Sequence, residues 1–275
     1  MVTTDLEVLV KKAKYVKNRW LLYAEMVDWL VDLISETYKA KKRFCTPNKI
    51  WNNNVLSERF RSGKPLFKGR DIPIDKEIIL DLYKTLVRKT EHRRGKLEGF
   101  GTLLPGSNSI GIILRSVLEN DLSTLESICQ KHLADASLVV LLMRIALWPS
   151  MRQLSIRAKK DLDLANWISG NCPICGSWPS LATINEGKNP RKLYCSLCET
   201  SWPFPRFKCP FCGNDQVEFL FYVYAEEEKD LRVDICKFCG QKVGTLDAKY
   251  YKLPIIPILD ELVISHLVMA TNCSS

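Results

Sequence analysis

The sequence predicts a multidomain α + small β protein. A helical domain over residues 1–168 is followed by two small cysteine modules, over residues 169–207 and 208–250, and by a C-terminal helix over residues 251–275. Three observations predict this fold class. Apolar residues recur at helical spacing through most of the first part of the chain. Beyond Gly170 the chain becomes turn-rich and β-prone. Eight of the eleven cysteines form four Cys-x-x-Cys pairs in that second part.

The first part is expected to fold into several helices. An apolar stripe at helical spacing begins at Leu6, and the stretch is long enough to break once, near Lys17. Asp75 is placed to cap a later helix, because its carboxylate can accept the first free backbone N–H groups. Residues 46–73 and 95–106 are rich in polar residues, Gly and Pro, and are expected to be irregular. The predicted helices cover residues 6–39, 75–94, 109–119, 122–131, 136–147 and 151–167.

The second part is expected to contain short strands and one more helix. Runs of β-prone residues between turns predict strands over residues 180–184, 191–194, 218–224 and 231–235. Apolar spacing then returns to the helical period between residues 250 and 271, where two prolines make the start a linker.

Composition and charge exclude several protein classes. The 275 residues are 46% hydrophobic and 26% charged, which excludes a disordered chain. No apolar run reaches the ~18 residues that a membrane span requires. The N-terminus has no basic segment leading to a small-residue cleavage site, so we expect a cytoplasmic protein. Residues 1–170 hold 29 basic and 19 acidic side chains, a net charge of +10, whereas residues 171–275 hold 11 and 12.

The cysteine pairs predict two metal sites. Two residues between cysteines let both thiolates bind one ion from a tight turn, and two pairs complete a tetrahedral site. A disulfide scaffold fits poorly, because the count is odd and the chain is too large to need one. Gaps of 19 and 23 residues inside the proposed sites suit short β-hairpins, so we favour sequential over interleaved pairing. The first site is Cys172, Cys175, Cys195 and Cys198, and the second is Cys209, Cys212, Cys236 and Cys239.

The four cysteine turns differ at one position. Glycine follows the second cysteine in three of them, where it can adopt a positive φ without steric cost, and Glu199 replaces it in the other. Four thiolates suit zinc and also a single rubredoxin-type iron, so we expect two metal ions per chain, Zn or Fe. Zinc would make the modules structural, and iron would permit one-electron chemistry.

Signals of catalysis are missing from the sequence. The three histidines lie far apart in helical stretches, and no phosphate-binding, metalloprotease, hydrolase or dinucleotide motif is present.

The cysteine segment resembles the formate dehydrogenase accessory protein (FdhE) family. The resemblance rests on CPICGSWP at 172–179, YCSLCETSW at 194–202 and RFKCPFC at 206–212. It continues through CKFCG at 236–240, Asp247 and the closing helix with Asp260. The helical part agrees with the family only in length and character.

The resemblance implies a helical domain joined to two rubredoxin-like or zinc-ribbon modules. It implies a cytoplasmic assembly factor, not an enzyme, that contacts the molybdenum- or tungsten-containing catalytic subunit of formate dehydrogenase or of a related oxidoreductase. Residues that accompany the cysteine turns are the candidate partner contacts: Glu199, Trp202, Arg206 and Asp247.

Two other functions stay open. Zinc ribbons also occur in nucleic-acid-binding proteins, but two divalent ions and eight thiolates would give residues 171–275 a net charge of −5, which disfavours polyphosphate binding there. The helical domain, at +10, could still bind nucleic acid. Iron at either site would make an electron-transfer protein.

Overall fold

The fold consists of a set of helices packed on a β-sheet. The structure, a computed structural model, describes residues 4–40, 58–94, 107–185 and 191–271. The predicted loop over residues 95–106 lies outside the described residues, as do residues 46–57 of the predicted irregular segment 46–73.

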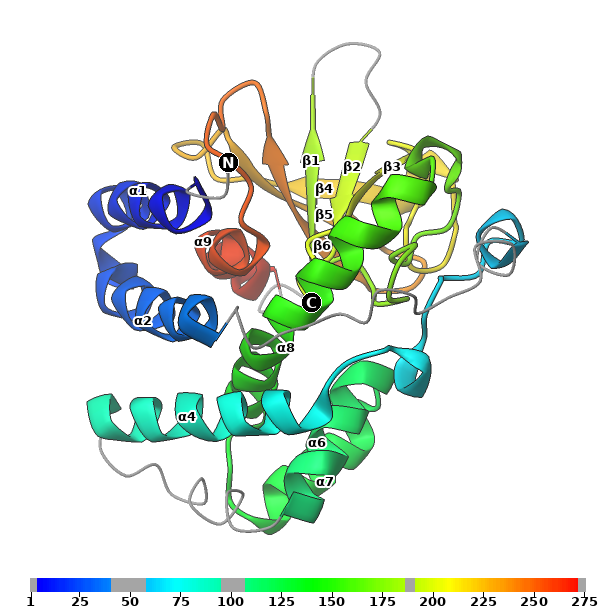
Figure 1. The fold of residues 1–275 in the computed structure, drawn as a ribbon. Coiled ribbons are helices and arrows are strands. Elements are labelled where there is room, and N and C mark those ends of the chain that lie inside the picture. The colour runs from blue at the N-terminus through cyan, green and yellow to red at the C-terminus, as the bar shows by residue number, and fades with distance from the viewer. Residues whose placement is uncertain (1–3, 41–57, 95–106, 186–190, 272–275) are drawn as a thin grey trace.

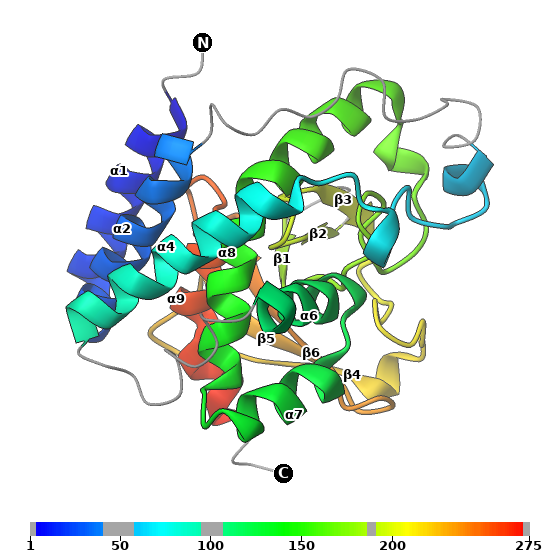
Figure 2. The ribbon, with the colours of Figure 1, turned by 60° about the horizontal axis from the view of Figure 1, so that its bottom comes forward.

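The first helical stretch folds into two helices that lie side by side, α1 (Thr4–Arg19) and α2 (Ala24–Ala40) (Figures 1 and 2). The predicted break is present, but it lies at Trp20 and the short 3₁₀ turn Leu21–Tyr23. Trp20 leaves the helical region of φ and ψ. Its indole N–H donates to Glu228, so a tertiary contact with a later segment accompanies the break.

Three further helices match the predicted positions: α4 (Lys76–Arg94), α6 (Ser107–Glu119) and α7 (Leu122–Lys131). Asp75 caps α4 as expected, since its Oδ1 accepts the backbone N–H groups of the second and third helical residues. Asp121 caps α7 in the same way.

The long helix α8 (Ala136–Ala158) corrects the sequence prediction. We predicted two helices, over 136–147 and 151–167, because proline normally interrupts a helix. The helix instead continues through Pro149 and ends at Ala158, and two 3₁₀ turns follow. Packing offsets the missing hydrogen bond, since α8 is buried at most positions between Leu142 and Leu154. Among the described helices α8 alone, with the turn after it, is long and apolar enough to cross a membrane, and 61% of its most apolar window is buried in the protein.

The second part forms one six-stranded sheet in the described residues, with strand order β3-β2-β1-β6-β5-β4. Each cysteine module contributes three antiparallel strands. The parallel pairing of β1 with β6 joins the two modules. The strands are β1 (Leu181–Ile184), β2 (Arg191–Tyr194), β3 (Ser201–Phe204), β4 (Leu220–Val223), β5 (Leu231–Cys236) and β6 (Lys242–Asp247).

Two of these strands were not predicted. Strand β3 contains Pro203, which argues against a strand by propensity but is tolerated at the edge of a sheet. Strand β6 contains Gly244, whose lack of a side chain lets the helix that contains Ile264 pack closely on the strand. A Cβ at this position would lie 2.7 Å from Cγ2 of Ile264. Both strands are therefore explained by tertiary contacts rather than by local sequence.

Each face of the sheet packs against different helices. One apolar cluster unites α9 (Pro257–Ala270) with α1 and the sheet residues Leu181, Val233 and Leu246. The other cluster unites α8 with residues such as Leu193 and Trp202 on the opposite side. In Figure 1, α8 runs from beside β3 to the helices α4, α6 and α7. The expected fold class, a helical N-terminal part with two zinc-ribbon-like modules and a C-terminal helix, is confirmed.

Candidate metal centres

The first four-cysteine cluster is buried between the sheet and the helices. Cys172, Cys175, Cys195 and Cys198 are each at most 2% exposed. Their sulfur atoms lie within 4.8 Å of one another. The Sγ atoms of Cys172 and Cys198 are 3.5 Å apart, as are those of Cys175 and Cys195.

The second cluster has the same composition but a more open position. Its sulfur atoms, from Cys209, Cys212, Cys236 and Cys239, also lie within 4.8 Å of one another. The Cys209–Cys239 and Cys212–Cys236 sulfur distances are 3.7 and 3.8 Å. Cys212 is exposed and Cys239 is half-buried. The structure thus shows the sequential grouping of cysteines, not the interleaved one.

Both clusters fit a tetrahedral metal ion. A sulfur–metal bond of ~2.3 Å gives a tetrahedron with edges of ~3.8 Å, close to the distances in both clusters. Disulfides are excluded at these positions, since their sulfur atoms would lie ~2.05 Å apart. Each cluster supplies four thiolates and closes the coordination shell, so the sites suit Zn²⁺ or a rubredoxin-type iron and leave no position for a substrate.

The same backbone turn presents the cysteines in all four pairs. In the first turn, Gly176 N–H donates to the Cys172 carbonyl, and Cys172 N–H donates to the Ser177 carbonyl. The other three turns, which begin at Cys195, Cys209 and Cys236, repeat both hydrogen bonds. The residue after the second cysteine has a positive φ in every turn, between 54° and 77°. This explains the glycine pattern seen in the sequence.

Glu199 adopts the left-handed conformation that glycine adopts in the other turns, with φ of 54°. Its carboxylate accepts from Arg152 Nε of α8 at 2.7 Å, and its carbonyl accepts from Lys159. The departure from the glycine pattern therefore coincides with an ion pair that joins the first module to the helical domain.

Hydroxyl groups surround the first site. Thr200 Oγ1 lies 3.1 Å from the Cys198 sulfur and 2.7 Å from Ser155 Oγ of α8. Ser177 Oγ lies 3.4 Å from the Cys175 sulfur. Sequence analysis missed these hydroxyls. Only the nearness of Thr200 and Ser177 to cysteine pairs hinted at them, and Ser155 is distant in sequence.

Burial makes the first site depend on its metal. Desolvation raises the pKa of the Cys172 thiol well above its usual range. Metal binding at this site must displace the proton that the Cys172 thiol carries. The buried cluster therefore couples metal loading to folding of the region around it.

The four predicted partner contacts occupy different environments. Trp202 is 1% exposed and packs in the core, so it offers no surface to a partner. Asp247 caps a turn by accepting the Lys249 N–H. Glu199 is engaged with α8. Of the four, Arg206 presents its side chain to solvent, with its guanidinium 5.8 Å from the ring centroid of Phe207.

Comparisons with known proteins agree with this architecture. Residues 171–206 match the family model described as FdhE, central domain. A protein FdhE homolog of Aquifex aeolicus is 31% identical over 107 residues, which cover 38% of each chain. A homolog from Shewanella oneidensis is 36% identical over 70 residues, 25% of this chain and 23% of that protein.

A solved structure extends the likeness to the whole fold. The crystal structure of the FdhE protein from Pseudomonas aeruginosa matches with a TM-score of 0.56 and 16% sequence identity. The match covers 98% of this chain and 90% of that chain. The resemblance to the FdhE family that the cysteine segment predicts is therefore confirmed, by the family model over residues 171–206 and in fold over nearly the whole chain.

Proposed function

We propose that this protein is a cytoplasmic accessory factor that binds the catalytic subunit of a molybdenum- or tungsten-dependent formate dehydrogenase during assembly. The observation that carries the proposal is the pair of closed four-thiolate sites in a segment that resembles FdhE proteins. A site with four protein ligands leaves no position on the ion for a substrate, so the ion stabilises the surrounding fold and the surface it presents. We accordingly assign the protein a binding role and no catalytic step.

The metal ions have a structural role in this proposal. The first set of thiolates, Cys172, Cys175, Cys195 and Cys198, would hold one ion inside the junction of module and helices. The second set, Cys209, Cys212, Cys236 and Cys239, would hold the other in a more exposed position. When bound, each ion supplies charge neutralisation and crosslinking of two turns. Iron in the second site would add one-electron chemistry, which the exposure of Cys212 would make accessible.

Co-purification tests the proposed function. The tagged full-length protein, with its metal content measured, is expected to retain the formate dehydrogenase catalytic subunit from cells that express both. A matched sample is tested against nucleic acid over a range of salt concentrations. Failure to retain the catalytic subunit, together with nucleic-acid binding that weakens steeply with salt, would replace this proposal with a nucleic-acid-binding function.

A further inference from the structure

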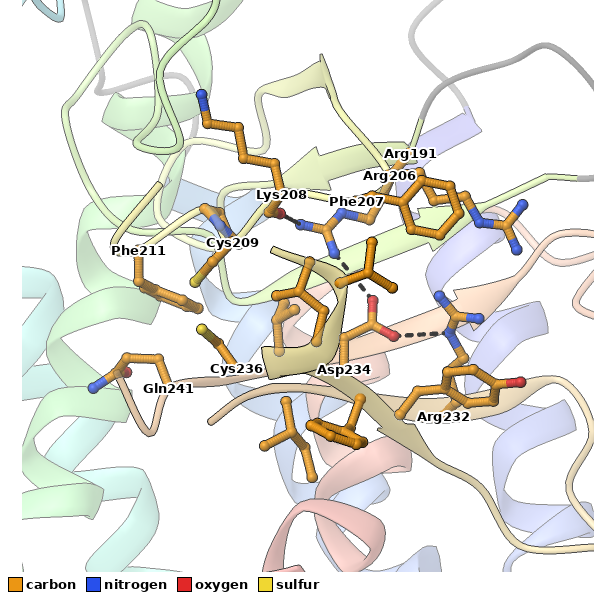
Figure 3. A pocket seen from close by; sticks show the side chains of 17 residues that line it. Arg191, Arg206, Phe207, Lys208, Cys209, Phe211, Arg232, Asp234, Cys236 and Gln241 are labelled. Atoms are coloured by element: carbon orange, nitrogen blue, oxygen red, sulfur yellow. Dashed lines mark hydrogen bonds and ion pairs between the residues drawn. The ribbon is translucent and has the colours of Figure 1, made fainter. Parts of the chain in front are cut away.

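A cavity of about 220 Å³ lies beside the second metal site. Its floor is the face of β4, β5 and β6 that points away from α9, and its wall is the loop over residues 206–211 (Figure 3). Two cysteines of the second site, Cys209 and Cys236, line it. Metal binding at that site therefore also fixes two sides of the cavity.

The cavity has an excess of positive charge. Four cationic side chains and one carboxylate line it, a net charge of +3: Arg191, Arg206, Lys208, Arg232 and Asp234. Asp234 is fully engaged, since Arg191, Arg232 and Thr245 all contact its carboxylate. Arg206 and Lys208 stand at the rim and form no ion pair with any described residue.

Arg191 leaves a buried donor without a partner. The residue is 4% exposed, and its two terminal nitrogens donate to Asp234 and to the Lys208 carbonyl. Its Nε has no hydrogen-bond partner among the described residues. An unsatisfied buried donor on a cation costs free energy, and a negative charge held near this guanidinium would offset part of that cost.

The walls and the neighbouring edge suit a polypeptide. The exposed aromatic side chains of Phe207 and Tyr222 flank the cavity, at 62% and 58% exposure. Strand β4 is the outermost strand of the sheet on this side, and Phe221, Tyr222 and Val223 are all exposed. An outermost strand has unpaired backbone groups on one side and can add an extended peptide as a further strand.

We propose that this cavity binds an acidic, extended segment of the partner polypeptide. The segment pairs with β4 and places its carboxylates near Arg206 and Lys208 at the rim. This assignment rests on the proposed function, which supplies the polypeptide partner. Single-stranded nucleic acid also combines negative charge with stacking on aromatic rings, but the edge of β4 offers backbone pairing that a polypeptide alone can use.

A labelled peptide tests the assignment directly. The probe is the fluorescein-labelled peptide VEVEFE, and binding to the metal-loaded, full-length protein is followed by fluorescence anisotropy. We expect saturable binding that weakens at least ~tenfold when glutamine replaces glutamate in the probe. The variant Arg206→Glu/Lys208→Glu should show a loss of similar size. Lys192→Glu, an exposed charge reversal on β2 outside the cavity, should bind as wild type does.

Three results would overturn the assignment. These are no binding of the peptide by wild type, equal binding of the glutamine probe, and tighter binding of oligo(dT) that the double variant loses. Co-purification of the catalytic subunit with each variant separates the two proposals. If the double variant retains the subunit as well as wild type does, the cavity is not the contact and the proposed function stands. If wild type and the Lys192→Glu control also retain none, the proposed function itself fails.

Discussion

The two metal centres use the same cysteine turns but lie in different surroundings. In the first, all four cysteines are buried, hydroxyls of Ser177 and Thr200 lie near the sulfur atoms, and Thr200 also bonds Ser155 of α8. In the second, Cys212 is exposed and a cavity adjoins two of the cysteines. The comparison teaches that a Cys-x-x-Cys pair determines the local geometry of a site. The packing around the site determines how much of the protein is destabilised when the site is lost.

The modules are also attached to the helices in different ways. Leu66 and Phe67 donate backbone hydrogen bonds to the carbonyls of Pro173 and Ile174, inside the first cysteine turn. The second module has no such backbone bond to the described part of residues 1–168, whereas Leu66 and Phe67 lie in a loop of that part. It is held by the pairing of its strand β6 with β1, by packing against α9 and by side-chain contacts such as the Arg19–Asp230 ion pair. We therefore expect the first site to stabilise the whole protein and the second to stabilise its own module.

The largest expected effect is loss of the first metal site. Cys172→Ala should destabilise the protein by ~5 kcal/mol and lower Tm by ~10–20 °C, because the site organises the junction of module and helices. Cys209→Ala should lower Tm much less and expose mainly residues 208–250 to protease. Calorimetry and limited proteolysis, with metal content measured on the same samples, make the comparison. Equal losses of Tm in the two variants would contradict it.

A buried ion pair provides the next test. Lys12 of α1 and Asp260 of α9 are both fully buried, and the Asp260 carboxylate also accepts from Tyr251 and from the Ile256 N–H. Lys12→Met would leave a buried carboxylate without its cation and should cost ~3–5 kcal/mol. The loss should affect the attachment of α9, and with it the second half of the sheet, more than the first metal site.

The pH dependence of this variant has a definite sign. Desolvation raises the pKa of Asp260, and removal of Lys12 raises it further. A carboxyl whose pKa is raised on folding favours the folded state when it is protonated and loses that advantage as pH rises from its unfolded value of ~3.9 through its folded pKa. The deficit of Lys12→Met relative to wild type should therefore be smaller at mildly acid pH than at neutral pH. A deficit independent of pH would show that lost packing dominates.

Chelation gives a smaller and kinetic difference. The exposed second site should release its metal to a chelator at least ~tenfold faster than the buried first site, since attack on the ion needs access to it. Release followed with a colorimetric metal indicator should show two phases, and the faster one should be absent in Cys209→Ala. A single phase for both ions would mean that exposure of Cys212 does not control release.

The sequence predicted elements whose signals are local. The Cys-x-x-Cys spacing correctly grouped eight cysteines into the two clusters, and Asp75 correctly marked the start of α4. The predictions that failed depend on tertiary packing. Pro149 stays helical because the core holds α8, and β6 forms because Gly244 admits Ile264. The sequence likewise could not predict that Trp202 is buried, because the local sequence around a cysteine turn does not determine whether an aromatic side chain packs inward or outward.

Local sequence patterns also could not predict that the two modules form one sheet. Strand β1 pairs in parallel with β6, more than fifty residues later in the chain. Gly170 makes a comparable distant contact, since a Cβ there would lie 1.8 Å from the Pro210 carbonyl oxygen. Composition marked Gly170 as a boundary, but only the fold shows that the first residues of one module pack on a cysteine turn of the other.

The smallest expected effect concerns Glu199, which departs from the glycine of the other three turns. A left-handed conformation costs a non-glycine residue ~1 kcal/mol, and a partly exposed ion pair such as Arg152–Glu199 contributes ~0.5–1 kcal/mol. Glu199→Gly removes both the strain and the ion pair, so its stability should stay within ~0.5 kcal/mol of wild type. Glu199→Ala keeps the strain and loses the ion pair, and should cost ~1 kcal/mol.

Partner binding decides whether Glu199 does more than attach the first module to α8. If its role is confined to Arg152, both variants should retain the catalytic subunit as wild type does, with unchanged metal content. Denaturant unfolding gives the stability difference, and co-purification gives the partner readout. A Glu199→Gly variant that is stable and metal-loaded but loses the subunit would place a partner contact at the buried first site as well. The first module would then bind the partner in addition to stabilising the fold.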